Sequence, residues 1–287
     1  MKVAIVTGGA SGIGRALSEE LARRGVEVVV ADRQADVAAQ VADGIARNGG
    51  RATAAELDVR SFEAFERMVH DARRRAGRID YLFNNAGIVV GGEMITYGLA
   101  DWNDVLDVNV RGVVHGVQAV YPIMREQGSG HIINTASVAG LTPAPEGSYT
   151  MSKWAVVGLS RALRVEGRLY GVRCSVLCPG AVRTPILTGG HFGRMNMSIS
   201  SDQIMQIWER MRPMAPAELA RRALDDVERD RPVIIYPRWW RLLWYMERFA
   251  PSLSIRLWQR FLDELRKETG PATAPAPRAD DRPVAQA

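Results

Sequence analysis

A phenol and an ammonium group lie four residues apart in the segment Tyr149-Thr150-Met151-Ser152-Lys153. Residues i and i+4 share one face of a helix, so Tyr149 and Lys153 would lie side by side if this segment is helical. A free phenol, with a pKa of about 10, is a poor base at neutral pH. A neighbouring ammonium stabilises the phenolate and lowers that pKa, which would make Tyr149 a general acid/base.

Two further polar residues could complete such a site. Ser137 follows an apolar segment, and its hydroxyl could orient a substrate oxygen by hydrogen bonding. Asn109 lies in a long helical pattern and could hold a water that relays protons. Hydride transfer to or from a carbonyl carbon needs a proton donor or acceptor near the oxygen, and these residues would supply it. The alternative is that Tyr149 and Lys153 form an accidental surface pair.

The segment from Thr7 to Gly14 joins a short apolar run to a helical pattern. Its glycines allow a diphosphate to approach the backbone, and the helix N-terminus behind it offers unpaired N–H groups. The cofactor-binding residues expected here are Gly8, Ser11, Gly12, Ile13 and Gly14. Asp32, at the end of the next apolar run, could accept hydrogen bonds from the adenosine ribose of NAD. The adjacent Arg33 could instead hold the 2′-phosphate of NADP, so NAD is favoured and NADP stays open.

Polar residues and glycine also follow the third and fourth apolar runs. Asp58 and Val59 end the third run, and Asn85, Ala86 and Gly87 follow the fourth. In open parallel sheets the carboxyl ends of the strands line the ligand crevice. Asp58 could therefore meet the adenine amino group, and Asn85 and Gly87 could place backbone against the ribose. Ordinary turn chemistry is the alternative.

The elements that must position these residues alternate along the chain. Strands are predicted at 3–7, 26–31, 52–57, 79–83, 131–135, 172–178 and 233–236, and helices at 14–24, 36–48, 61–76, 101–127, 149–170 and 217–229. Strands separated by helices imply βαβ units and a parallel sheet covered on both faces. The predicted fold class is α/β, a doubly wound Rossmann fold of about seven strands followed by amphipathic C-terminal helices.

These motifs together resemble the short-chain dehydrogenase/reductase superfamily over about residues 1–236. The segment 7–14 is similar to the family's cofactor loop, and Asn84 to Gly87 to its Asn-Asn-Ala-Gly motif. The catalytic residues implied by the resemblance are Asn109, Ser137, Tyr149 and Lys153. It implies that Tyr149 is the general acid/base and that Lys153 lowers its pKa and binds the nicotinamide ribose. It also implies that Asn109 keeps the proton-relay water.

The resemblance extends to the segment after the sixth predicted strand. Pro179, Gly180, Val182 and Thr184 match a loop that contacts the cofactor carboxamide. Two departures, Met151 and Trp154, change local packing and no reacting group. The resemblance further implies a homo-oligomer, a dimer or tetramer.

Aromatic residues and arginines crowd the region 238–265. Its members include Arg238, Trp239, Trp240, Arg241, Trp244, Tyr245, Arg248, Phe249 and Trp258. Such a pattern is typical of an interfacial helix, and three interpretations stay open: peripheral membrane contact, a subunit interface, and a lid over an apolar pocket. Apolar, adaptable pocket walls are predicted at Met195, Met197, Met205, Ile207, Trp208 and Met211, which indicates a hydrophobic substrate.

Composition sets the outer limits of this interpretation. With 287 residues, 47% hydrophobic, the chain can form one large domain over 1–236, the helices of 237–269 and a Pro/Ala-rich, disordered 270–287.

The net charge of +5 comes with no nucleic-acid fold motif, so no nucleic-acid partner is expected. Cys174 and Cys178 are expected to be buried thiols, with no zinc spacing and no metal. No secretory signal or membrane span is visible, which favours a cytoplasmic protein, with peripheral membrane contact open.

The predicted function is transfer of a hydride between NAD(P) and a hydrophobic alcohol and its ketone or aldehyde. One alternative is a dinucleotide-binding regulatory or scaffold protein that has the fold without the chemistry. Another is the same enzyme with NADP as its cofactor.

Overall fold

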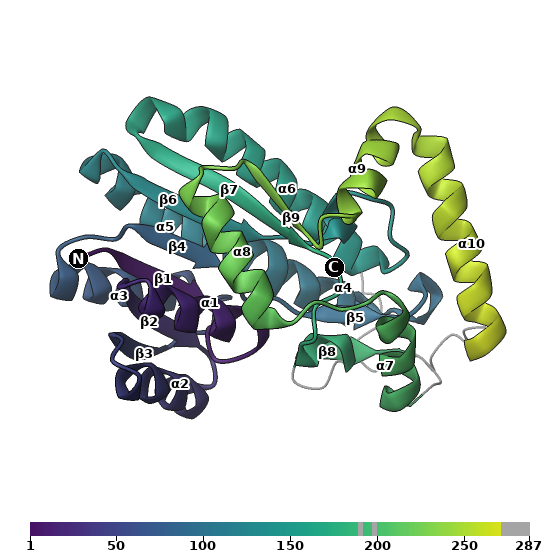
Figure 1. The fold of residues 1–287 in the computed structure, drawn as a ribbon, viewed down its shortest axis with the longest axis horizontal. Coiled ribbons are helices and arrows are strands. Elements are labelled where there is room, and N and C mark those ends of the chain that lie inside the picture. The colour runs from purple at the N-terminus through teal and green to yellow at the C-terminus, as the bar shows by residue number, and fades with distance from the viewer. Residues whose placement is uncertain (189–191, 197–199, 271–287) are drawn as a thin grey trace, which may run out of the picture.

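A seven-stranded parallel sheet organises the molecule (Figure 1). The computed structural model describes residues 1–188, 192–196 and 200–270. The strands are β1 (Val3–Thr7), β2 (Glu27–Asp32), β3 (Ala52–Glu56), β4 (Tyr81–Asn84), β6 (Gly130–Thr135), β7 (Val172–Pro179) and β9 (Val233–Tyr236). Their order is β3-β2-β1-β4-β6-β7-β9, so the chain reverses direction across the sheet between β1 and β4. The predicted doubly wound α/β fold with seven strands is confirmed.

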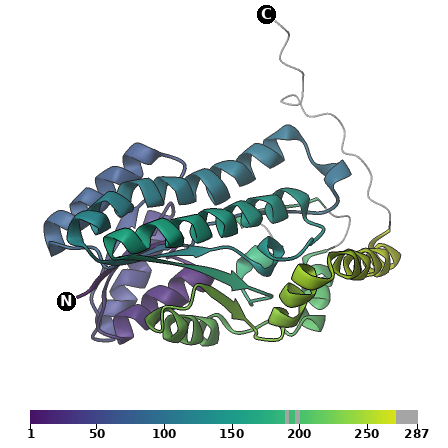
Figure 2. The same cartoon turned by 90° about the horizontal axis from the view of Figure 1, so that it is seen from above.

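Helices cover both faces of the sheet (Figure 2). One face carries α1 (Gly12–Arg23), α2 (Ala35–Arg47) and α8 (Pro216–Glu228), and the other carries α3 (Phe62–Ala76), α5 (Gly112–Gln127) and α6 (Gly147–Gly167). Strand β1 shows why both layers form: Ala4 and Val6 pack with the first set of helices, and Ile5 packs with the second. Because successive strand residues point to opposite faces, a continuously apolar strand requires cover on both sides.

The predicted long helix at 101–127 is not regular. It consists of α4 (Leu99–Leu106), a π-helical turn η2 (Asp107–Arg111) and α5. The π turn accommodates Asn109, which is fully buried and hydrogen-bonded to backbone outside the helix. Hydrophobic periodicity continues through the turn, so it does not reveal the change of winding.

Short elements complete the structure. They are β5 (Val89–Gly91), which pairs in parallel with β8 (Gly193–Met195), the 3-10 helices η1 (Met94–Thr96), η3 (Val138–Gly140), η4 (Arg168–Tyr170) and η5 (Pro185–Thr188), and α7 (Ser201–Arg210). The pair β5–β8 was not predicted, because three-residue strands are too short to show a period. Helix α7 carries three of the predicted apolar pocket residues, Met205, Ile207 and Trp208.

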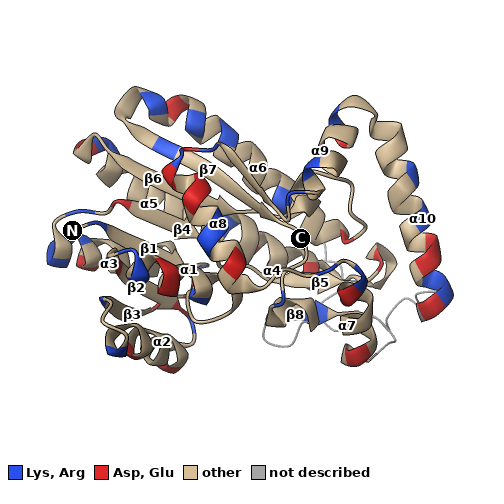
Figure 3. Ribbon diagram, in the orientation of Figure 1, with Lys and Arg blue, Asp and Glu red and all other residues tan. Residues whose placement is uncertain are grey.

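The chain continues beyond β9 in two helices, α9 (Trp240–Phe249) and α10 (Pro251–Thr269). Helix α10 is held by ion pairs between Arg266 and Glu93 and between Arg210 and Glu268. Most charged residues lie on helices and loops (Figure 3). Cys174 and Cys178 are buried and unbonded to each other, as expected. The predicted disorder of 270–287 falls, beyond Gly270, outside the described residues.

No helix among the described residues combines the length and apolar character needed to cross a bilayer. Within the same residues no cluster of His, Cys, Asp and Glu could hold a metal ion.

Candidate active site

A cavity of about 790 Å³ lies at the carboxyl ends of the parallel strands. The predicted site residues all line it except Gly14 and Asn109. Of the predicted apolar walls, Met195, Ile207, Trp208 and Met211 line the cavity, Met205 does not, and Met197 lies outside the described residues. Residues from segments far apart in the sequence therefore meet at one edge of the sheet, as the strand-end argument requires.

The loop between β1 and α1 has a shape that only glycine permits at three positions. Gly8 and Gly12 adopt φ angles of +63° and +51°, which L side chains rarely adopt. A Cβ on Gly8 would lie 2.9 Å from the Cα of Ala86, and a Cβ on Gly14 would lie 2.0 Å from the carbonyl oxygen of Gly8. The loop and the N-terminus of α1 thus form a side-chain-free cradle that fits a diphosphate. The buried Gly14 shapes this cradle from behind and does not line the cavity.

Asp32, at the end of β2, lies beside the cradle. Its carboxylate accepts hydrogen bonds from the backbone N–H groups of Ala10, at 3.1 Å, and Gln34, at 3.0 Å. These bonds fix the carboxylate at the cavity wall, and each oxygen keeps a further lone pair for a ligand hydroxyl. The exposed Arg33 lines the same cavity, so the structure retains both cofactor interpretations.

Asp58 has a partner that the sequence did not indicate. The guanidinium of Arg60 donates to both oxygens of this carboxylate and holds the pKa of Asp58 below its usual value. An adenine amino group would share the carboxylate with Arg60. The adjacent Val59 contributes its side chain to the cavity wall.

Thr7 is a residue that the predicted site left out. Its hydroxyl oxygen accepts hydrogen bonds from the backbone N–H groups of Asn85, at 3.0 Å, and Ala86, at 3.1 Å. The Asn85 side chain in turn donates to the Thr7 carbonyl oxygen at 3.1 Å. These bonds join the ends of β1 and β4, where the two segments leave the sheet. Asn85 therefore supports the cradle with its side-chain amide, and a hydroxyl residue at the end of the first strand was the signal for Thr7.

Tyr149 and Lys153 lie on one face of α6, as their spacing predicts. The Lys153 Nζ lies 5.3 Å from the centre of the Tyr149 ring and donates a hydrogen bond to the carbonyl oxygen of Thr135 at 3.1 Å. Only 4% of Lys153 is exposed, so this ammonium is held between α6 and the end of β6.

The expected lowering of the Tyr149 pKa is not found in the protein by itself. Burial raises the pKa of Tyr149 to about 12, the hydrogen bond with Ser137 opposes that rise, and the Glu146 carboxyl adds to it. Burial also lowers the pKa of Lys153 to about 8. Desolvation disfavours the charged form of each group, and here it outweighs their proximity. The protein alone thus keeps Tyr149 as a protonated phenol, which is the form that donates a proton.

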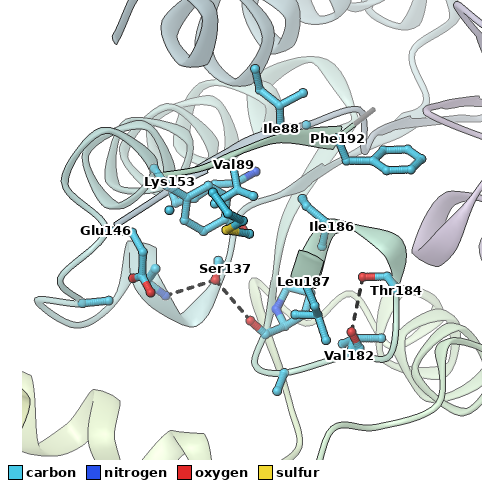
Figure 4. Close-up of a pocket in the computed structure, with 18 of the residues that line it drawn as sticks. Ile88, Val89, Ser137, Glu146, Lys153, Val182, Thr184, Ile186, Leu187 and Phe192 are labelled. Carbon is cyan, nitrogen blue, oxygen red and sulfur yellow. Dashed lines mark hydrogen bonds between the residues drawn. The ribbon is translucent and has the colours of Figure 1, made fainter. Parts of the chain in front are cut away.

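Ser137 lies at the centre of the cavity (Figure 4). Its hydroxyl donates to the carbonyl oxygen of Pro179 at 3.4 Å and accepts from the backbone N–H of Ala139 at 3.2 Å. Ser137 also interacts with the Tyr149 phenol, so the two hydroxyl groups lie near each other in the cavity. A single substrate oxygen can be held there.

Asn109 lies behind the cavity wall. Its Oδ1 accepts from the Ile88 backbone N–H at 2.8 Å, and its Nδ2 donates to the Ile88 carbonyl oxygen at 2.9 Å and to the Ser152 hydroxyl at 3.1 Å. A Cβ on Gly87 would lie 3.3 Å from Asn109 Oδ1 and 3.4 Å from Lys153 Nζ, so the three residues converge. The side-chain amide fixes the segment after β4, and the water relay expected at Asn109 stays a prediction.

Comparison with known proteins agrees with this geometry. The family model described as short chain dehydrogenase matches residues 2–190. The chain belongs to the short-chain dehydrogenase family. An uncharacterized oxidoreductase of Listeria monocytogenes is 38% identical over 189 residues, 65% of this chain and 76% of the relative. The oxidoreductase UcpA of Salmonella typhimurium is 37% identical over 187 residues, 64% and 71% of the two chains.

Solved structures extend the likeness beyond the matched segment. A short-chain dehydrogenase/reductase from Burkholderia phymatum in complex with NAD aligns with a TM-score of 0.74 and 30% identity, over 96% of this chain and 98% of that one. Levodione reductase aligns with a TM-score of 0.73 and 30% identity, over 82% and 95%. This short-chain dehydrogenase is therefore an oxidoreductase with a Rossmann-type fold.

The rest of the cavity in this short-chain dehydrogenase is mostly apolar. Figure 4 shows Ile88, Val89, Ile186, Leu187 and Phe192 among the residues that line it. A charged residue among them is Glu146, just before α6, and burial raises the pKa of its carboxyl. Glu146 was not predicted from the sequence, because a single acidic residue in a loop carries no pattern.

Helices α9 and α10 supply one wall of the same cavity. Trp240, Trp258, Phe261, Leu262 and Leu265 line it. Trp240 packs so closely on the loop after β7 that a Cβ on Gly180 would lie 2.1 Å from its indole nitrogen. Of the three interpretations of this region, the structure supports a cavity wall for the inner faces of the two helices. The outer faces of α9 and α10 do not line the cavity.

Proposed function

We propose that this short-chain dehydrogenase interconverts a hydrophobic alcohol and its ketone or aldehyde with NAD, and that Tyr149 is its general acid/base. One observation carries the proposal. The Tyr149 phenol and the Ser137 hydroxyl interact in one cavity, which joins the glycine cradle to apolar walls. The cradle would hold the cofactor diphosphate, and Asp32 would accept hydrogen bonds from the adenosine ribose.

The cofactor, when bound, supplies or accepts the hydride. In carbonyl reduction, Ser137 would hold the substrate oxygen by a hydrogen bond while the Tyr149 phenol donates a proton to that oxygen. In alcohol oxidation the phenolate would take the proton back, and positive charge beside the ring would favour that form. Lys153, fixed by the Thr135 carbonyl oxygen, provides such a charge and would also bind the nicotinamide ribose. The apolar walls would exclude water from the reacting atoms.

The substitution Tyr149→Phe tests the catalytic role. It removes only the hydroxyl, so cofactor affinity, measured by NADH fluorescence, should stay within about twofold while turnover falls by about 10²- to 10⁴-fold, the usual contribution of acid/base catalysis. Tyr121→Phe is the matched control, because the Tyr121 hydroxyl bonds with Glu166 outside the cavity. Near-full activity of Tyr149→Phe would refute the role. Tight NAD binding without turnover of any alcohol would favour a regulatory module instead.

The apolar walls favour a bulky alcohol or carbonyl compound, and a panel of steroid, retinoid and long-chain alcohols with NAD would narrow the substrate class. The homo-oligomer and the cytoplasmic location expected from the sequence stay predictions. The exposed apolar side chains of Met151 and Trp154 on α6 support an interface between subunits.

A further inference from the structure

Helices α9 and α10 have apolar side chains on two opposite faces. The inner faces line the cavity, through Trp240 and Trp258 among others. The outer face of α9 presents Leu242, Tyr245 and Phe249, which are spaced by three and four residues and therefore lie on one side of the helix. Leu242 is 74% exposed and Phe249 82%. Apolar residues this exposed, on one side of one helix, mark a contact surface.

The outer face of α10 continues this surface with alternating apolar and basic groups. Leu253, Arg256, Leu257 and Arg260 are spaced as neighbours on one helical face, and all four are exposed. We call the side chains of Leu242, Tyr245, Phe249, Leu253, Arg256, Leu257 and Arg260 the hairpin outer face.

Residues 238–260 carry a mostly positive charge. Residues 238–260 contain five arginines, Arg238, Arg241, Arg248, Arg256 and Arg260, and a single acidic residue, Glu247. Figure 3 shows the basic positions along α9 and the first part of α10, with acidic residues gathered toward the end of α10. The Arg248 guanidinium lies 5.6 Å from the ring centre of Trp244, so its positive charge is held next to aromatic surface. A partner for this surface must offer both apolar depth and negative charge.

We propose that the hairpin outer face docks on an anionic lipid bilayer. Leucine and aromatic side chains enter the boundary between headgroups and acyl chains, and arginines bind lipid phosphates at the same depth. Contact would be interfacial, since no described helix meets the requirements for spanning a membrane. A second copy of this chain fits less well, because a two-fold interface would bring the same arginines together.

Docking in this way has a consequence for the substrate, which rests on the proposed function. The helices that would lie on the lipid surface also form one wall of the substrate cavity through their inner faces. A substrate that partitions into the bilayer would then reach the cavity over a short path. This identifies the substrate class as a lipid-soluble alcohol or carbonyl compound, and sets it apart from a small polar alcohol.

Vesicle co-sedimentation tests the docking. The full chain should pellet with vesicles of phosphatidylcholine and phosphatidylglycerol, and pellet far less with phosphatidylcholine alone or at high salt. The double variant Leu242→Ser/Phe249→Ser should lower the partition coefficient by roughly a hundredfold, because burial of each side chain is worth roughly tenfold or more. Val165→Ser/Leu169→Ser is the matched control, since these residues are similarly exposed, at 78% and 71%, on another part of the surface. Neither pair lines the cavity, so both variants should keep wild-type NAD affinity.

Three results would overturn the proposal. The wild-type chain could fail to bind anionic vesicles, the hairpin variant could bind as well as wild type, or Arg256→Glu/Arg260→Glu could leave binding unchanged. Sedimentation velocity separates a further case: if the wild-type oligomer loses subunits in Leu242→Ser/Phe249→Ser, the hairpin outer face pairs copies of this chain, and the membrane proposal is wrong. Turnover is measured without vesicles, so failure of the enzymatic proposal would appear separately from failure of docking.

Discussion

Replacement of Asp32 by asparagine should reduce the preference for NAD. The carboxylate is only 7% exposed and is fixed at the cavity wall by two backbone N–H groups. Hydrogen bonds from ribose hydroxyls to a charged acceptor contribute about 1.5–3 kcal/mol each. Loss of one such bond therefore lowers the affinity for NAD by about ten- to a hundredfold. Asparagine keeps the shape of the side chain and one acceptor oxygen, so the loss of negative charge accounts for most of the loss of NAD affinity.

The same charge sets the response to NADP. A phosphate group about 4 Å from the carboxylate would be repelled by about 4 kcal/mol per charge pair at an effective dielectric constant of about 20. Asp32→Asn removes that repulsion, and Arg33 can then contribute to phosphate binding. We expect the ratio of kcat/KM for NAD to that for NADP to fall by at least about a hundredfold from these two effects combined.

Steady-state kinetics with both cofactors measures this ratio. Asp36→Asn is the matched control, because it removes an exposed charge from the nearby first turn of α2 and does not line the cavity. Thermal unfolding of each variant shows whether loss of one of the two backbone hydrogen bonds has loosened the cradle. A wild-type enzyme that already prefers NADP, or an unchanged ratio in Asp32→Asn, would refute the reasoning and show that Arg33 decides the cofactor.

Three other predictions follow from buried groups. Burial lowers the pKa of His131 from 6.5 to about 3. Between these two pH values the unfolded chain binds more protons than the folded chain. The free energy of unfolding should therefore fall by about 1.4 kcal/mol for each pH unit as the pH decreases from 6.5. Urea unfolding from pH 7 to 4 should show a flatter slope for His131→Gln than for wild type, and equal slopes would contradict the assignment. Gly180→Ala should displace the Trp240 indole, destabilise the protein by about 1–3 kcal/mol and shift the tryptophan emission to longer wavelength. Gly158→Ala is the control and should cause neither change, because a Cβ on Gly158 would have no atom within 4 Å. Glu146→Gln removes a charge that raises the pKa of Tyr149, so the pH midpoint of alcohol oxidation should move to lower pH, and an upward shift would refute this effect.

The fold could be predicted because hydrophobic patterns that the sequence displays also determine the layers. Residues such as Ala4, Ile5 and Val6 form a strand that is apolar on both sides, and this requires helices on both faces. The π turn around Asn109 could not be predicted, since its cause is a set of hydrogen bonds to Ile88 and Ser152 from distant parts of the chain. Tertiary bonds of this kind leave no local period.

Some features of the candidate active site could likewise be predicted from the sequence, and others could not. The positions of Tyr149, Lys153 and Ser137 followed from spacing and strand ends, because a parallel sheet brings those ends together. The protonation of Tyr149 did not follow, since desolvation depends on how many neighbours enclose the ring. The role of Trp240 was equally hidden: the sequence shows an aromatic residue on an amphipathic helix, and only the structure shows it packed against Gly180.

The proposed catalytic residues and much of the proposed substrate wall lie in different parts of the chain. The predicted catalytic residues and most of the cofactor cradle lie within residues 2–190, the segment that the family model matches. Much of the apolar wall lies beyond it, in Ile204, Trp208, Trp240 and Trp258. The close packing of Trp240 on Gly180 joins the two parts, because Gly180 belongs to the loop expected to hold the cofactor. A change in the C-terminal helices can therefore alter which alcohol fits, and the shared cavity and the packing of Trp240 connect these helices to the proposed reacting groups. Substrate preference in this protein should consequently be sought in α7, α9 and α10, and its hydride chemistry at the ends of the strands.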